Sequence, residues 1–279
     1  MLKKAILYMV FSTISFALLN LLVKHLKGFN AYELVFFRSI GSLFFTFPFL
    51  IKNKLPILGN NQKMLIGRSV VGFLAMSFFF LAIHNLPMAS AVSIRYTAPI
   101  FAAFFAIFLL KEKLYALQVL FFIISFLGVI ILKGFQTDIS LLGLLFALLS
   151  AILTGLVFIY IRKIGKSEHP VVVVNYFMVV STILGGLMSI FNWKTPQGIE
   201  WLWMSAMGIV GYFGQYFMTK ALQIVESNKI APFYYLEVIF TLLLGLFFIN
   251  ESYTWISVLG ISLILIGLIL NVLYRKSKL

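Results

Sequence analysis

The sequence contains no cysteine, and it has few charged residues. Without a thiol, the chain can form neither a disulfide framework nor a thiolate metal site. Only 11% of the residues are charged, whereas 62% are hydrophobic and the mean hydropathy is +1.06. A water-soluble domain cannot cover that much apolar surface. The composition therefore predicts an integral membrane protein whose first partner is the lipid bilayer.

Acidic residues are especially scarce: eight against 22 lysines and arginines, which gives a formal net charge of +14. A charge of this size can indicate nucleic-acid binding. Here, however, the basic residues occur singly or in pairs between apolar runs and form no basic stripe. We therefore expect no nucleic-acid partner and assign the charge to the membrane surface.

The usual enzyme signatures are also missing from the sequence. It contains no Walker loop, no dinucleotide-binding glycine motif and no His-Glu-x-x-His, and its three histidines lie far apart. We therefore expect that the protein is not an enzyme and holds neither a metal nor a cofactor.

Long apolar runs fill the chain almost from end to end. A bilayer core of about 30 Å needs about 20 apolar residues per helix. Ten runs fit this length, and they cover residues 5–22, 31–51, 65–83, 89–110, 114–132, 140–161, 171–191, 201–222, 230–249 and 253–274. The connections between them are short. These runs predict an all-α integral membrane protein with ten transmembrane helices.

The second half of the chain repeats the first. Glu112 and Gly128 are 16 residues apart, as are Glu251 and Gly267, and the two pairs are related by a shift of 139 positions. The predicted helix boundaries follow the same shift. This predicts two five-helix repeats, 1–133 and 139–274. Because five is an odd number, the second repeat must cross the bilayer in the opposite direction, which is an inverted repeat.

The charges between the runs predict the orientation in the membrane. Sixteen lysines and arginines, Arg68 among them, belong to the two termini and to the connections on the same side of the bilayer. The opposite side carries four, and the remaining two, Arg38 and Arg95, lie inside runs. The positive side faces the cytoplasm, so both termini should be cytoplasmic.

At this point the chain resembles the EamA family of the drug/metabolite transporter superfamily, which are ten-helix carriers of the bacterial inner membrane. The motifs are "ELVFFRS", "LPMASAVSIRYTAPIFAAFFAIFLLKEKL" and, in the second repeat, "IAPFYYLEVIFTLLLGLFFINES". The family's hinge glutamates are matched by Glu112 and Glu251, and its prolines by Pro99 and Pro232. The resemblance implies a secondary active transporter, a permease or exporter, for small organic metabolites such as amino acids or nucleoside-like compounds.

The two hinge glutamates and two repeated glycines are interpreted as structural. Glu112 and Glu251 each precede an apolar run, where a carboxylate complements the positive N-terminal end of the following helix. Gly128 and Gly267 lie within runs, where small residues let helices approach closely in lipid.

Three ionisable residues lie deep inside apolar runs: Arg38, Arg95 and Glu237. A charge at this depth is costly unless it is paired or hydrated, so each should face the bundle interior. Arg38 is interpreted as a structural anchor between helices, with a functional role as the alternative. Arg95 and Glu237 occupy equivalent helices of the two repeats, which should meet at the bilayer centre. We predict that these two charges polarise a central substrate cavity.

Polar and aromatic residues should complete the wall of this cavity: Tyr234, Gln215, Tyr96, Thr241, Tyr212 and Ser77. A zwitterionic substrate could take its carboxylate to Arg95 and its ammonium group to Glu237. Alternatively, Glu237 could take up a coupled proton, because desolvation favours the protonated carboxyl group.

Two other classes of membrane protein are weighed against a carrier. An integral-membrane enzyme or lipid-handling protein would need a carboxylate or histidine cluster at one interface, and the sequence displays none. A membrane scaffold or sensor would normally add a soluble domain. The carrier is expected to work by alternating access, as a monomer or weak homodimer.

Overall fold

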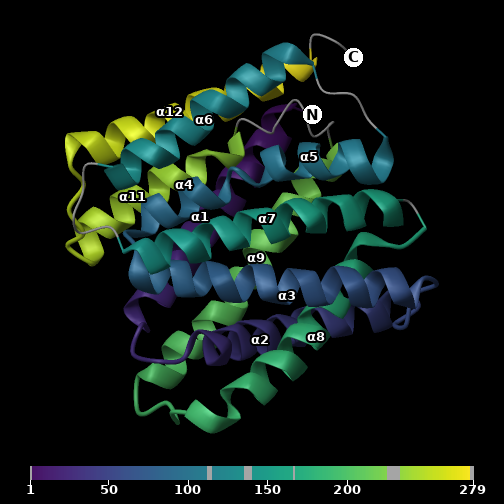
Figure 1. The fold of residues 1–279 in the computed structure, drawn as a ribbon. Helices are drawn as coiled ribbons and strands as arrows, with labels where there is room; N and C mark the ends of the chain where they lie inside the picture. The colour runs from purple at the N-terminus through teal and green to yellow at the C-terminus, as the bar shows by residue number, and fades with distance from the viewer. Residues whose placement is uncertain (1, 112–114, 135–139, 166, 225–232, 277–279) are drawn as a thin grey trace.

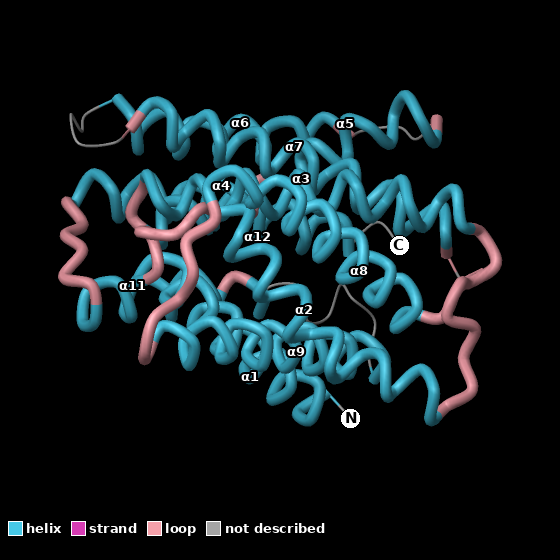
Figure 2. The backbone as a smooth tube through the Cα atoms, turned by 90° about the horizontal axis from the view of Figure 1, so that it is seen from below, coloured by secondary structure: helices cyan, strands magenta, loops and turns pink. Residues whose placement is uncertain are grey.

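The computed structural model describes residues 2–111, 115–134, 140–165, 167–224 and 233–276. Within these ranges the secondary structure is helical, and no strand occurs (Figures 1 and 2). The first half contains α1 (Leu2–His25), α2 (Ala31–Lys52), α3 (Gln62–Asn85), α4 (Met88–Arg95), α5 (Ala98–Leu110) and α6 (Ala116–Gly134). The second half contains α7 (Leu141–Ile164), α8 (Pro170–Ser189), η1 (Ile190–Asn192), α9 (Glu200–Ile224), α11 (Leu236–Phe248) and α12 (Trp255–Lys276).

Every predicted apolar run coincides with one or two of these helices. Among the residues that the structure describes, seven spans are long and apolar enough to cross a membrane, namely α1, α2, α3, α4 with α5, α7, α8 with η1, and α12. The helices α6 and α11 are apolar but shorter, and α9 is 25 residues long. Large hydrophobic side chains are widely exposed, including Phe44, Phe191 and Trp255. Together these features describe a multi-pass membrane protein whose outer surface is solvated by lipid.

Short polar residues begin several of the helices. The side chains of Asn30, Asn61, Ser140 and His169 each accept a hydrogen bond from a backbone N–H in the first turn of α2, α3, α7 and α8, respectively. Such caps satisfy backbone donors that have no partner within the helix. The positions at which these four helices begin therefore follow directly from the local sequence.

The fourth predicted run is a broken helix. α4 ends at Arg95 and α5 begins at Ala98, with Tyr96 and Thr97 between them. Pro99 lies in the first turn of α5, and a proline has no N–H to donate and clashes with the carbonyl group four residues earlier. A comparable break occurs at Tyr235, just before α11, and Tyr235 is the counterpart of Tyr96 at the shift of 139. The two tyrosine rings meet edge to face with centroids 5.3 Å apart.

The helix contacts are consistent with an exchange of the two halves. The contact between α3 and α7 corresponds to the contact between α9 and α1. In the same way, the α2–α9 contact corresponds to α8–α3, and the α5–α7 contact corresponds to α11–α1. The equivalent helices α2 and α8 pack against each other, as do α6 and α12, and these pairs lie at opposite edges of the bundle (Figure 1).

The α6–α12 contact is built around the two repeated glycines. A Cβ atom on Gly128 would lie 2.6 Å from the carbonyl oxygen of Gly260, and one on Gly267 would lie 2.5 Å from that of Phe121. Both distances are shorter than a van der Waals contact, so only glycine permits this approach of the two backbones.

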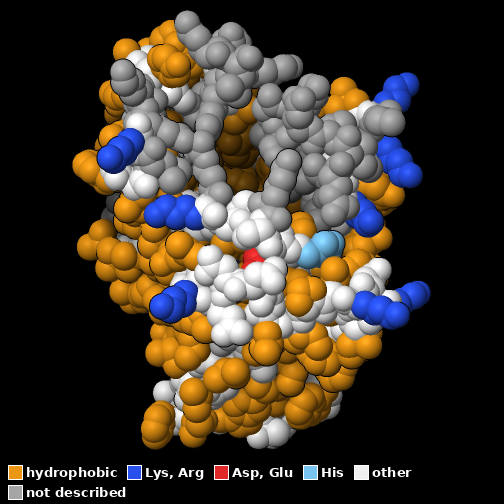
Figure 3. Space-filling view, turned by 90° about the vertical axis from the view of Figure 1, so that its right-hand side faces the viewer, with side chains coloured by type: hydrophobic (Ala, Val, Ile, Leu, Met, Phe, Trp, Pro, Cys, Tyr) orange, Lys and Arg blue, Asp and Glu red, His pale blue; other side chains and the backbone are white. Residues whose placement is uncertain are grey.

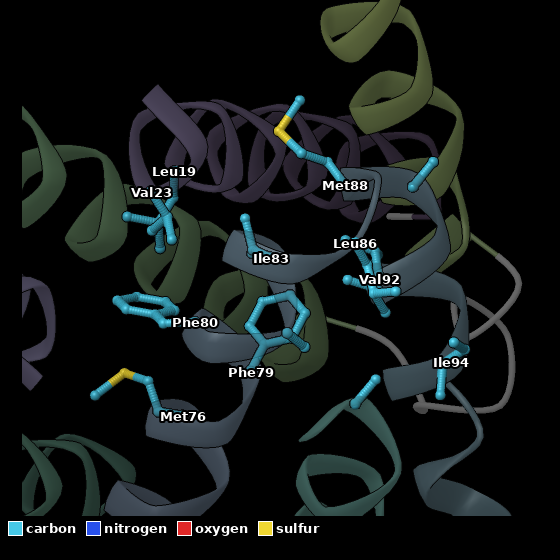
Figure 4. Packing of buried hydrophobic residues seen from close by; sticks show 14 of the residues in the cluster. Leu19, Val23, Met76, Phe79, Phe80, Ile83, Leu86, Met88, Val92 and Ile94 are labelled. Carbon is cyan, nitrogen blue, oxygen red and sulfur yellow. The ribbon is translucent and has the colours of Figure 1, made fainter. Parts of the chain in front are cut away.

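Aliphatic and aromatic side chains from α1, α3 and α4 form the largest buried core. Leu19 and Val23 of α1 face Phe80 and Ile83 of α3, and Val92 of α4 packs into the same cluster (Figure 4). This core holds α4 in place and so fixes the position of its last residue, Arg95.

The connections gather at two opposite ends of the bundle. At one end Glu251 lies beside Lys24 and Met88, and the side chain of Glu33 accepts a hydrogen bond from the backbone of Lys194. At the other end the carboxylate of Glu168 accepts hydrogen bonds from the backbone N–H groups of residues 60 and 61 at 2.5 and 2.6 Å. We name these the Glu251 end and the Glu168 end.

The Glu168 end is the more basic of the two. It carries the exposed residues Lys52, Lys54, Lys63 and Lys163, and Figure 3 shows basic side chains spread over this face. Arg68, which belongs to the predicted basic set, is not exposed at this end. Arg68 lies inside α3 rather than in a connection, and its side chain is buried. A hydropathy profile assigns a charge near the start of a run to the connection, although the helix here begins six residues earlier.

Candidate functional site

A buried carboxylate lies at the meeting point of the two broken helices. Glu237 is the second residue of α11 and is only 1% exposed. Its Oε1 accepts hydrogen bonds from Nη2 of Arg95 at 3.0 Å and from Nδ2 of Asn20 at 2.9 Å, and its Oε2 accepts one from the Tyr96 hydroxyl at 2.7 Å. These groups come from α4, α1 and the break after α4. Glu237 is therefore fully paired, which is what a buried charge requires.

The breaks place each charge at the favourable end of a helix. Arg95 is the last residue of α4, where the backbone carbonyl groups make the helix end partly negative. Glu237 lies in the first turn of α11, where the free N–H groups make the end partly positive. An unbroken helix would offer neither end at this depth. The helix breaks therefore position the two charges and also stabilise them.

Arg95 is the accessible member of the pair. Its side chain is 25% exposed, whereas that of Glu237 is 2% exposed. The guanidinium carbon lies 3.8 Å from the centre of the Phe79 ring on α3, a cation–π contact that holds the group in place. A ligand that reaches this point meets the guanidinium group before the carboxylate.

Five of the predicted site residues come together here. The Tyr96 hydroxyl lies 3.0 Å from the backbone oxygen of Tyr234, and the hydroxyl oxygen of Thr241 lies 3.4 Å from Nδ2 of Asn20. With Arg95 and Glu237 they form one network, which we name the ion-pair site. Asn20 is a direct partner of Glu237, and the sequence signal for it was only an amide isolated in an apolar run.

Tyr212 and Gln215 occupy a different place. They line a cavity of about 160 Å³ between α2, α8 and α9, which we name the α2–α8–α9 cavity. Its wall is formed by Ser42, Thr46, Phe49, His169, Pro170, Val171, Val174, Met178, Tyr212, Gln215, Tyr216 and Lys220. The structure therefore places these two residues in a cavity wall formed with α2 and α8, because the rotation of α9 about its axis directs them toward these helices.

Ser77 joins neither group through a hydrogen bond. It is buried on α3, its hydroxyl finds no partner among the described residues, and it is not part of the cavity wall. Arg38 is also buried, and its Nη1 lies 2.6 Å from the sulfur atom of Met76. Its guanidinium carbon is 5.9 Å from the Phe177 ring of α8, and that of Arg68 is 4.4 Å from the same ring. The sequence reasoning missed Arg68 and Phe177.

The hinge glutamate of the second repeat binds a different helix from the one expected. Both oxygens of Glu251 accept hydrogen bonds from the backbone N–H of Met88, at 3.1 and 2.9 Å. Glu251 therefore stabilises the N-terminus of α4, not that of α12, which begins four residues further on at Trp255. Glu112, its counterpart, lies outside the described residues.

Two further residues complete the contacts of Glu251. Nζ of Lys24 lies 3.4 Å from the carboxylate and donates to the backbone oxygens of Ile83 and Leu86. The Tyr253 hydroxyl donates to Oε2 at 2.5 Å and accepts from the N–H of Ala89. Burial and the neighbouring carboxylate raise the pKa of Tyr253, so its hydroxyl remains a donor at neutral pH. These contacts tie α1, α3 and α4 to the connection before α12 and close the Glu251 end.

Apolar helices long enough to span a bilayer, a break between α4 and α5, and a buried ion pair that joins this break to the first turn of α11 are features of membrane transporters. Two segments of the chain, 3–133 and 141–273, match the EamA-like transporter family, and the chain belongs to this family. The resemblance stated from the motifs is thereby confirmed.

Individual proteins support the same class. The chain is 28% identical to human solute carrier family 35 member G1 over 97% of its own length and 80% of that protein. It is also 28% identical to the pseudopaline exporter CntI of Pseudomonas aeruginosa, over 96% of both chains. One crystal structure shares the fold with a TM-score of 0.71 at 19% identity, covering 98% of this chain and 97% of the other.

Proposed function

We propose that the protein is a secondary active transporter of small organic metabolites, working by alternating access around the ion-pair site. The observation that carries the proposal is the Arg95–Glu237 ion pair, at 3.0 Å, between helix breaks in opposite halves of the chain. Broken helices bind substrates in many transporters because their ends present unpaired backbone groups and partial charges.

The two ends of the bundle support alternating access. Lys24, Glu251 and Tyr253 hold the Glu251 end closed, while the α2–α8–α9 cavity lies toward the Glu168 end, where His169 and Pro170 line it. The exchangeable helix contacts of the two halves suggest an inverted repeat, 1–133 and 139–274, with ten membrane crossings. In such a protein the halves can exchange conformations, which closes the open end and opens the closed one.

A substrate would act on the ion pair itself. The carboxylate of a zwitterion can take the place of Glu237 beside Arg95, and its ammonium group can take the place of Arg95 beside Glu237. Both buried charges then stay compensated during transport. A coupled proton on Glu237 is the alternative, because a carboxyl group without its guanidinium partner is easier to protonate. Both routes predict that transport depends on the two charges together.

Charge also suggests the location. The basic Glu168 end would face the cytoplasm of a bacterium, with the protein in the inner membrane and both termini cytoplasmic. In this orientation the α2–α8–α9 cavity would lie toward the cytoplasm.

The proposal is tested with purified protein in liposomes, screened for gradient-driven uptake of labelled amino acids and nucleosides. We expect uptake of at least one compound by the wild type and its loss in Arg95→Gln and Glu237→Gln. Glu200→Gln is the matched control, because Glu200 is a carboxylate at the Glu251 end with a loose contact of 3.9 Å to Lys194. Wild-type uptake in Glu237→Gln would exclude the ion-pair site as the transport site.

A further inference from the structure

Two buried arginines lie beside one aromatic ring. Arg38 of α2 is 5% exposed and Arg68 of α3 is 8% exposed. Their guanidinium carbons lie 5.9 and 4.4 Å from the ring centre of Phe177 on α8, so both charges share one small region of the interior. Like charges this close repel each other, and burial strengthens the repulsion.

No acidic residue of the described ranges neutralises this pair. The carboxylates of Glu33, Glu168, Glu200, Glu237 and Glu251 each have at least one of the other partners named above. Arg38 has the thioether of Met76, which is a weak acceptor. Nε of Arg38 and both Nε and Nη1 of Arg68 are buried and find no acceptor in the described part of the chain.

A cation–π contact compensates a buried guanidinium group only in part, and it uses none of the N–H donors. A fork of N–H donors without an acceptor is the complement of an oxyanion. The region is therefore short of negative charge and of hydrogen-bond acceptors at the same time.

Two glycines bring the neighbouring helices close to these groups. A Cβ atom on Gly211 of α9 would lie 3.2 Å from Nε of Arg38, and one on Gly72 of α3 would lie 3.1 Å from the Phe177 ring. Ser181 lies one turn beyond Phe177 on the same face of α8, and its buried hydroxyl has no partner among the described residues. It can donate to the same ligand.

The α2–α8–α9 cavity leads from the Glu168 end toward Arg38. Ser42, which lines the cavity, lies one helical turn from Arg38 on α2, and its hydroxyl donates to the backbone oxygen of Arg38. The cavity wall contains Lys220 and His169 and no acidic residue. A cavity lined by one sign of charge concentrates ligands of the opposite sign.

We propose that the substrate carries an oxyanion group, a carboxylate or a phosphate, that binds between Arg38 and Arg68. The planar guanidinium forks bind either group through two parallel hydrogen bonds. This inference rests on the proposed transport function and narrows its substrate class. It also assigns Arg38 a binding role in place of the structural anchor expected from its position in the sequence.

Thermal unfolding of the purified protein in detergent tests the site without transport. Sodium succinate and sodium phosphate serve as probes, with sodium chloride at equal ionic strength as the reference. We expect at least one probe to raise Tm in a saturable manner, and the stronger probe identifies the oxyanion. Arg38→Gln and Arg68→Gln should abolish the shift, whereas Lys54→Gln, which removes an exposed charge at the Glu168 end, should keep it.

A second measurement separates binding from a structural role. Without ligand, Arg68→Gln should unfold at the same temperature as the wild type or higher, because it removes a buried charge that repels its neighbour. Arg68→Lys keeps the charge but loses the fork, so its succinate or phosphate shift should be reduced at least several-fold. The proposal is overturned if neither probe exceeds sodium chloride, or if both glutamine variants retain the wild-type shift.

Liposome uptake then distinguishes the two proposals. If the anion shift is absent but a zwitterion or nucleoside is taken up, the substrate class is wrong and the transport function stands. If the anion shift depends on both arginines but no compound is taken up, the binding site stands and the transport function fails.

Discussion

Arg95 is the last residue of α4 and Glu237 lies in the first turn of α11, and their side chains are 3.0 Å apart across the interface of the two halves. The two residues are 142 positions apart in the chain. Each therefore depends on a contact that only the complete bundle provides.

The first prediction concerns the coupling of this pair. Arg95→Gln leaves the buried Glu237 carboxylate without its guanidinium partner, whereas Glu237→Gln leaves Arg95 partly exposed. Breaking a buried pair from one side typically costs about 3–5 kcal/mol. We expect Arg95→Gln to lower Tm more than Glu237→Gln, and the double variant to be more stable than the sum of both losses predicts. Strict additivity would show that the two charges do not interact.

The second prediction concerns orientation, and the absence of cysteine makes it simple to test. Single cysteines at Gln62, near the Glu168 end, and at Gln197, in the connection before α9, should respond differently to a membrane-impermeant thiol reagent. In intact cells we expect labelling at 197 only, with 62 labelled after permeabilisation. The reverse pattern would place the Glu168 end outside the cell.

The third prediction concerns the closed Glu251 end. Glu251→Gln removes the charge that holds the first turn of α4 and neutralises Lys24, and the loss of a helix-end charge alone is about 0.3–1 kcal/mol. Ser90 is buried just inside this end. A cysteine at Ser90 should therefore react slowly in an otherwise unchanged protein and several-fold faster with Glu251→Gln. Equal rates would mean that these contacts do not keep the end closed.

The fourth prediction concerns the α6–α12 contact. Gly267→Ala brings a Cβ atom within 2.5 Å of the backbone oxygen of Phe121, so the helices must separate. Overpacking of this kind costs about 1–3 kcal/mol. Gly28→Ala is the control, because its nearest neighbour would be Nζ of Lys194 at 3.8 Å. Thermal unfolding should show a loss for Gly267→Ala alone, and similar Tm values would contradict the close contact.

Much of the helix layout could be predicted because each span must be apolar over a length set by the bilayer. The shift that relates the two halves also brought Arg95 and Glu237 together, since equivalent helices meet in the interior. The connection of Glu251 to α4 could not be predicted, because the nearest helix along the chain is not the nearest in space. The break at Tyr235 was likewise hidden, because Val238 stands where the first half has Pro99.

The locations of Tyr212, Gln215 and Arg68 depend on how each helix is rotated about its axis. Periodicity is a poor guide to that rotation when a helix is apolar on nearly all sides. Arg68 shows this well, because its contact with Phe177 requires a face of α3 that looks no more polar than the others.

The unpaired charges of Arg38 and Arg68 have an electrical consequence. When the empty carrier turns the site from one side of the bilayer to the other, both arginines move positive charge through the membrane potential. Moving one elementary charge across the whole potential changes the energy by about 2.3 kcal/mol per 100 mV. An anion bound between them cancels part of that charge. The resting voltage of a cell, negative inside, would then act differently on the loaded and the empty carrier, so turnover would register as a current.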